Sequence, residues 1–198
     1  CDRFGVLVWQ DLMLSNMDYP LKDEAFKKNL LEEIHFQFAR LSQFVSISIL
    51  CGGNEIYQQA AMLGVDESFF KDDFFEHELM KITSNYFGMA IYLPNTPSGG
   101  DLPFHVGSGF SHFYAVGAYR KNFEIVQCSH VKFASESNGF SHLERENVLS
   151  RNFANEVIRD KLSDWCDGIP KDNTANWDFE DIRDYYLEYL FKIDSKKL

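Results

Sequence analysis

The sequence predicts an α/β fold with a parallel sheet and, within that class, a barrel. Short apolar runs alternate with amphipathic helical stretches at the spacing of βα units. Each run is short and is hardly interrupted by polar residues, as expected for strands that are buried on both faces. Neither GxGxxG nor GxxxxGK[ST] follows any of them, which disfavours the nucleotide-binding doubly wound sheets. A (β/α)8 barrel is therefore the better prediction.

The elements follow from hydrophobic periodicity and turn residues. The predicted strands are residues 4–11, 45–50, 89–93, 112–119 and 130–136. The predicted helices are residues 23–44, 66–86, 145–165 and 178–193. In the first helix, steps of three and four residues place one apolar face at Phe26, Leu30, Ile34, Phe38 and Leu41. In the second, Asp66 is the expected N-cap. No repeat, low-complexity segment or linker divides the 198 residues, so a single domain region is expected.

Composition excludes several classes of partner. The formal net charge is −11, from 19 basic and 30 acidic residues, and this disfavours nucleic acid and anionic membranes, which need clustered Lys and Arg. The sequence contains no run of about 18 apolar residues, so no transmembrane helix is expected. The four cysteines lie far apart without a CxxC pair, so neither a metal site nor a disulfide framework is expected. His105 and His112 lack a third residue that would complete a metal site.

Polar residues stand at the ends of three predicted strands. They are Gln10 and Asp11, then Asn54 and Glu55, and finally Ser135 and Glu136. Functional residues of barrels gather at the C-terminal ends of strands, so these residues are expected at one face of the barrel.

Glu55 and Glu136 form a candidate catalytic pair. Retaining hydrolysis of a glycosidic bond uses two carboxyl groups roughly 5–5.5 Å apart, and an interval of several βα units could bring these two together. The competing interpretation is that each glutamate is a helix cap or a surface residue, as most of the 30 acidic residues must be. Composition and spacing leave both interpretations open. Aromatic residues make up 16% of the chain, and they suit either a core or a sugar-stacking surface.

Several motifs carry a resemblance to a known family. "CDRFGVLVWQDLM", "CGGNE", "PNTPSGGDLPFH", "SHFYAVGAY" and "VKFASE" occur in this order. Together they resemble the catalytic barrel of family 2 glycoside hydrolases, closest to the β-mannosidase branch, over nearly the whole chain.

The resemblance implies a role for each matching residue. Glu55 would be the acid/base and Glu136 the nucleophile of a two-carboxylate, double-displacement mechanism. The substrate would be a carbohydrate with a β-linked sugar, most closely a β-mannoside, and no cofactor is implied. The expected substrate-binding residues are Asn54, Trp9, Asp11, His112 and Tyr114.

The resemblance also implies that residues 1–198 are a partial TIM barrel. They would supply about strands 3 to 7 of a larger multidomain enzyme, whose N-terminal domains and remaining barrel strands lie outside this chain. The segment alone is then expected to lack activity. Leu93 and Tyr114 stand where the family often has Trp, so β-glucuronidase, β-galactosidase and endo-β-mannosidase remain alternatives. A non-catalytic sugar-binding remnant remains the alternative from another class.

Overall fold

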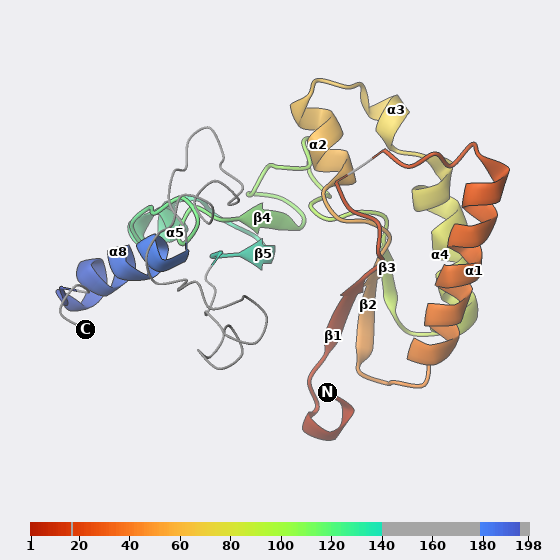
Figure 1. The fold of residues 1–198 in the computed structure, drawn as a ribbon, viewed down its shortest axis with the longest axis horizontal. Coiled ribbons are helices and arrows are strands. Elements are labelled where there is room, and N and C mark those ends of the chain that lie inside the picture. Colours follow the sequence, from red (N-terminus) through yellow and green to blue (C-terminus); the bar gives the residue numbers. More distant parts are fainter. Residues whose placement is uncertain (17, 140–178, 195–198) are drawn as a thin grey trace, which may run out of the picture. The chain divides into compact units, whose positions relative to one another are not determined.

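The computed structural model describes residues 1–16, 18–139 and 179–194, which form two compact units (Figure 1). The first unit comprises the described residues of 1–112 and 130–135, and the second comprises residues 113–129, 136–139 and 179–194. None of the described helices has both the length and the apolar character needed to cross a bilayer.

A three-stranded parallel sheet organises the first unit. Its strands β1 (Val8–Asp11), β2 (Ile47–Cys51) and β3 (Ile91–Leu93) lie side by side with β2 in the centre. Both neighbouring pairs are parallel. The α/β class and the parallel order predicted from the sequence are thus confirmed, whereas a partial barrel stays a prediction.

Helix α1 (Glu24–Leu41) begins at Asp23, whose carboxylate accepts hydrogen bonds from Ala25 N at 2.9 Å and Phe26 N at 3.1 Å. The predicted apolar face is confirmed, because Leu30, Ile34 and Phe38 are buried and Phe26 and Leu41 pack beside them. Full burial of each such side chain contributes about 1.5–3 kcal/mol to folding. This face anchors the helix in the core.

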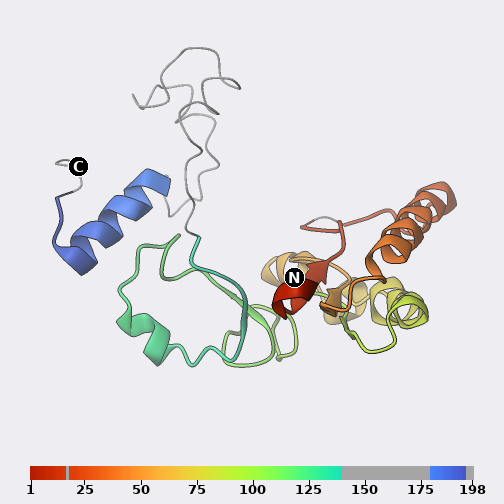
Figure 2. The ribbon, with the colours of Figure 1, turned by 90° about the horizontal axis from the view of Figure 1, so that it is seen from below.

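Helix α1 lies beside α4 (Leu79–Tyr86), as Figures 1 and 2 both show. Phe38 meets Phe87 edge to face with ring centroids 5.2 Å apart. The core around them contains Leu12, Leu14, Leu30, Ile34, Phe38, Leu50, Tyr57, Phe74, Phe75, Leu79 and Phe87. It fixes the strands whose ends carry the candidate site.

The single helix predicted over residues 66–86 is wrong. The structure has α3 (Glu67–Phe70), a π-helical turn η2 (Phe74–Glu78) and then α4. Asp66 is the N-cap of α3 as predicted, accepting from Ser68 N at 3.0 Å. A new helical turn begins after Asp72, whose carboxylate accepts a hydrogen bond from Phe74 N at 2.8 Å. This side-chain bond to the backbone competes with continuation of the helix.

Two shorter helices were not predicted: α2 (Ile56–Met62), which follows Glu55 directly, and α5 (Glu124–Cys128). A short 3-10 turn, η1 (Asp2–Phe4), precedes β1. The predicted helix 145–165 lies outside the described residues.

Strands β4 (Ser111–Phe113) and β5 (Ala134–Ser137) form a two-stranded sheet. In the first unit Ser111 N donates to Phe133 O at 2.9 Å, and in the second Asn138 N donates to Phe113 O at 3.3 Å. The predicted strand 112–119 is therefore wrong beyond Phe113. Its second half turns at Gly117, which has a φ of 94°, a left-handed conformation that favours glycine.

The second unit contains α5 and α8 (Phe179–Phe191), the latter close to the predicted helix 178–193. Its described core consists of Val116, Ile182 and Tyr186. The Tyr186 hydroxyl accepts from Gly117 N at 2.8 Å and donates to Lys121 O at 2.6 Å. These bonds tie the turn after β4 to α8.

Candidate active site

The C-terminal ends of the three parallel strands meet at one edge of the sheet. Asp11 is paired with Cys51, which is paired in turn with Leu93. Beyond these residues the pairing continues, because Asn54 forms parallel bridges with Ser15 and with Thr96. The segments that follow the strands are thus held in register, as expected for the functional end of a parallel sheet.

Glu55 has an unusual backbone at this edge. It is the N-cap of α2 and adopts the left-handed conformation, with φ 57° and ψ 5°. A non-glycine residue in this region costs free energy and persists where its surroundings determine it. Here Glu55 N donates to Thr96 O at 2.7 Å. The left-handed backbone of Glu55 sets the direction in which its side chain projects from the main chain.

The two glycines before Asn54 serve close packing. The sequence suggests that they let the chain turn, but neither has a positive φ, and the left-handed residue is Glu55 itself. A Cβ on Gly52 would lie 2.7 Å from Pro94 O and would also meet the Tyr92 hydroxyl. A Cβ on Gly53 would lie 2.7 Å from Asn95 Nδ2. Glycine is required because other segments approach the backbone here.

Gly52→Ala is expected to destabilise the protein by about 1–3 kcal/mol, because the added methyl group overlaps backbone that cannot move freely. The matched control is Gly88→Ala, since a Cβ there meets nothing within 4 Å. Apparent melting temperatures of the two variants and the parent protein measure the effect. Equal melting temperatures for both variants would contradict this account of Gly52.

The Glu55 carboxylate is held by side chains of its own unit. Oε1 accepts from Gln58 Nε2 at 3.0 Å and lies 2.8 Å from His112 Nδ1. The Glu55 side chain is 20% exposed and that of His112 only 3%. An ionised carboxylate only accepts hydrogen bonds, so Nδ1 is the donor in this contact whenever Glu55 is ionised.

These contacts change the acidity of Glu55. The hydrogen bond from His112 lowers the pKa of the Glu55 carboxyl, burial opposes this, and Gln58 and Gln59 lower the pKa further. A lowered folded-state pKa means that ionised Glu55 stabilises the fold above its unfolded pKa. That contribution is lost as the pH falls through the folded-state pKa.

His112 continues a chain of polar side chains within the first unit. Its Nε2 lies 3.4 Å from Thr96 Oγ1, which lies 2.6 Å from Ser135 Oγ. Thr96 is 1% exposed. The Ser135 hydroxyl also donates to Ser111 O at 3.3 Å. These contacts hold the position of the imidazole ring that faces Glu55.

Trp9 and Asp11 lie two residues apart in β1, and their side chains are in contact. The Trp9 indole Nε1 donates to Asp11 Oδ1 at 2.7 Å. The Trp9 ring is stacked on Phe133, at 5.7 Å between centroids, and meets Phe110 edge to face at 5.3 Å. A substitution at either Trp9 or Asp11 is therefore expected to move the other.

In the second unit, the Tyr114 hydroxyl donates to Glu136 Oε2. Tyr114 follows β4 and Glu136 lies in β5. Both side chains are half-buried. The phenol orients the carboxylate of the predicted nucleophile.

Sequence reasoning missed two contributors to the site. Thr96 follows the strand 89–93, so the same strand-end rule that selected Glu55 could have selected it. Gln58 lies one turn along α2 from Glu55, but that helix was not predicted. The structure also gives His112 a partner, Glu55, that the sequence did not indicate.

Comparisons with known proteins bear on the resemblance seen in the motifs. No family model matches the chain. The chain is 34% identical over 112 residues to "Beta-mannosidase B" of Emericella nidulans, and 30% identical over 112 residues to "Beta-mannosidase B" of Aspergillus oryzae. Each match covers 50% of this chain and 13% of the relative. The chain thus spans a small part of the length of these curated relatives.

A solved structure, a beta-D-mannosidase from Dictyoglomus thermophilum, is similar with a TM-score of 0.64 and 26% sequence identity. The match covers 79% of this chain and 19% of that one. Sequence and structure therefore agree on one group of relatives. The resemblance to the β-mannosidase branch of the family 2 glycoside hydrolases is confirmed.

Proposed function

We propose that the chain is part of a retaining glycosidase of the β-mannosidase type. The similarity to β-mannosidases in both sequence and structure carries the proposal. The geometry around Glu55 supports it, because a half-buried carboxylate stands at a strand end with a strained backbone and a histidine partner. Sites of this kind are where catalytic groups are found.

The proposed mechanism uses two carboxyl groups, one as the nucleophile and one as the acid/base. Glu136 attacks the anomeric carbon, the bond from that carbon to the glycosidic oxygen breaks, and the Glu55 proton passes to the leaving oxygen. Ionised Glu55 then takes a proton from water, whose oxygen attacks the glycosyl-enzyme and releases Glu136. The sugar leaves with its anomeric configuration retained. No cofactor enters either step.

The other predicted residues would bind the sugar. Asn54 would hydrogen-bond its 2-hydroxyl, a contact that strengthens in the transition state. Trp9 and Asp11 would face the sugar from β1, while His112 and Tyr114 would contact it and orient the two carboxylates. Asp11 ends β1, Asn54 follows β2 and Tyr114 follows β4, whereas Trp9 lies within β1 and His112 within β4.

The fold proposal is a partial TIM barrel. Residues 1–198 would supply about strands 3 to 7, with N-terminal domains and the remaining strands provided by a longer parent protein. The small share of each relative that the chain covers supports this. The carbohydrate substrate would then bind to the assembled parent protein.

A panel of 4-nitrophenyl β-glycosides tests the specificity. The full-length protein is expected to hydrolyse the β-mannoside with a kcat/KM at least about tenfold above those for the galactoside, glucoside and glucuronide, a difference of about 1.4 kcal/mol in transition-state binding. A faster galactoside or glucuronide would support another family 2 specificity. Sugar binding without release of nitrophenol would support a non-catalytic remnant.

His112→Ala is expected to move the basic limb of the kcat/KM profile to higher pH. His112 lowers the pKa of Glu55, so its removal raises that pKa and keeps the acid protonated at higher pH. Gln58→Ala should move the limb in the same direction by less, because the Gln58 hydrogen bond has the smaller effect. A basic limb that stayed in place, or moved down, in His112→Ala would contradict the assignment of Glu55 as the acid.

A further inference from the structure

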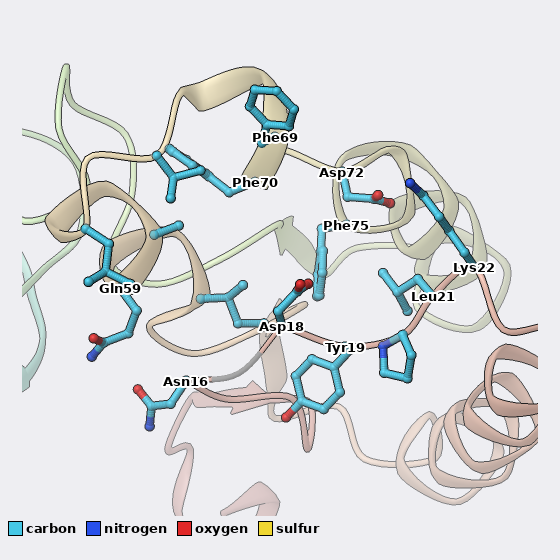
Figure 3. Close-up of a pocket in the computed structure, with 15 residues that line it drawn as sticks. Asn16, Asp18, Tyr19, Leu21, Lys22, Gln59, Phe69, Phe70, Asp72 and Phe75 are labelled. Carbon is cyan, nitrogen blue, oxygen red and sulfur yellow. The ribbon is translucent and has the colours of Figure 1, made fainter.

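An apolar pocket of about 570 Å³ lies in the first unit beside the helix that Glu55 caps (Figure 3). Its walls come from the segment that follows β1, from α2, from the segment between α2 and η2, and from Phe75 of η2. Pockets of this size accommodate small organic groups. None of the residues assigned above to catalysis or to sugar binding lines it.

One face of α2 forms a wall of the pocket. Ile56, Gln59 and Ala60 line it, followed by Leu63 just beyond the helix. These positions are separated by three and four residues, so they share a face. Gln59 lies at the margin of that face, one turn along α2 from Glu55, and its backbone N donates to Glu55 O at 2.9 Å. The pocket and the proposed acid therefore adjoin one another through Gln59.

The chemistry of the lining favours an apolar occupant. Aromatic rings come from Tyr19, Phe69, Phe70 and Phe75. The Tyr19 hydroxyl is already bonded, since it accepts from Ser15 N at 2.8 Å and donates to Ser15 O at 3.2 Å. Tyr19 therefore offers its ring rather than a free hydroxyl.

The charged lining residues disfavour an anion. Asp18 and Asp72 contribute carboxylates and Lys22 an ammonium group, which leaves the pocket with a net negative charge. Asp72 is further committed to capping Phe74 N at 2.8 Å. At the rim, Phe69 is 80% exposed and Leu63 is 81% exposed. A neutral apolar group would cover this surface, whereas an acidic group would be repelled.

We propose that this pocket receives the leaving group of the substrate, and that this group is a neutral alkyl or aryl aglycone. The inference rests on the proposed function, in which Glu55 protonates the oxygen that joins sugar and leaving group. Whatever that oxygen carries must extend away from the sugar on the side of Glu55. The adjoining apolar pocket then selects aglycones that bury carbon against its aromatic walls.

Methyl and hexyl β-mannoside test this in the full-length protein. The two alcohols have similar acidity, so the chemical step is alike and the ratio of kcat/KM values reports binding of the alkyl chain. Burial of the five additional methylene groups is expected to favour the hexyl compound by at least about tenfold. Ala60→Phe fills the pocket and should bring the ratio close to one. Phe69→Ser, which removes an exposed rim ring, should also lower the ratio and does not disturb the core.

Met62→Phe is the matched control, since Met62 is on the same helix, is 65% exposed and is not part of the lining. Its ratio should equal that of the parent protein. A parent ratio near one, with methyl β-mannoside still hydrolysed, would overturn the pocket assignment and leave the proposed function standing. A high ratio that survives both Ala60→Phe and Phe69→Ser would also overturn it. If no β-mannoside is hydrolysed at all, the proposed function fails and the inference fails with it.

Discussion

Glu136→Ala in the full-length protein is expected to lower kcat for 4-nitrophenyl β-mannoside by about 10⁴-fold or more. Removal of a nucleophile abolishes the covalent route, and losses of this order or larger follow when an enzyme loses its nucleophile. The alanine variant lacks the carboxylate that the Tyr114 hydroxyl positions in the parent protein. Release of nitrophenol by stopped assay measures the loss.

Glu188→Gln is the control for this variant, because Glu188 is an exposed residue of α8. It should retain the parent rate. A Glu136→Ala protein that keeps more than about one tenth of the parent kcat would show that Glu136 is not the nucleophile.

Glu55→Ala is expected to give a loss that depends on the leaving group. Positioned proton transfer contributes about 10²–10⁴-fold, and the need for it is greatest when the departing alcohol is a poor leaving group. Alkyl β-mannosides should therefore lose the full factor in kcat/KM. Compounds with an acidic phenol, such as the 2,4-dinitrophenyl β-mannoside, should lose much less in the first step.

Azide distinguishes this role from simple misfolding. The second step of Glu55→Ala lacks a general base for water, and azide needs none, so it should accelerate turnover of the dinitrophenyl compound and give a β-glycosyl azide. The His112 side chain, which is 3% exposed beside Glu55, should remain in place to line the space. Equal losses for good and poor leaving groups, with no response to azide, would contradict the acid/base role.

Local features of the sequence predicted local structure well. The steps of three and four in residues 23–44 identified the buried face of α1, and Asp66 was the N-cap it was predicted to be. The break after Phe70 was missed, because the aromatic pattern continues past it while Asp72 binds the backbone of a new turn. Periodicity reports which face is buried, and it does not report where a side chain interrupts the backbone ladder.

The sequence predicted only part of the candidate site, because its local patterns do not report tertiary contacts. The strand-end rule located Asn54 and Glu55 at the end of β2, and the structure places them there. It could not indicate that Glu55 is bonded to His112, because 57 residues separate them and the contact depends on tertiary structure. Nor could it show that Glu55 itself takes the left-handed conformation while Gly52 and Gly53 serve close approach. The approach of Glu55 to Glu136 stays a prediction.

Covalent trapping tests the central proposal most directly. A 2-deoxy-2-fluoro-β-mannosyl fluoride slows both steps, while its fluoride leaving group lets the first step proceed, so the glycosyl-enzyme accumulates. Digestion of the full-length protein and mass spectrometry should then find one fluoromannosyl group, and it should be on Glu136. A label on another carboxylate, or an absence of label together with hydrolysis that inverts the anomeric centre, would contradict the retaining mechanism with Glu136 as its nucleophile.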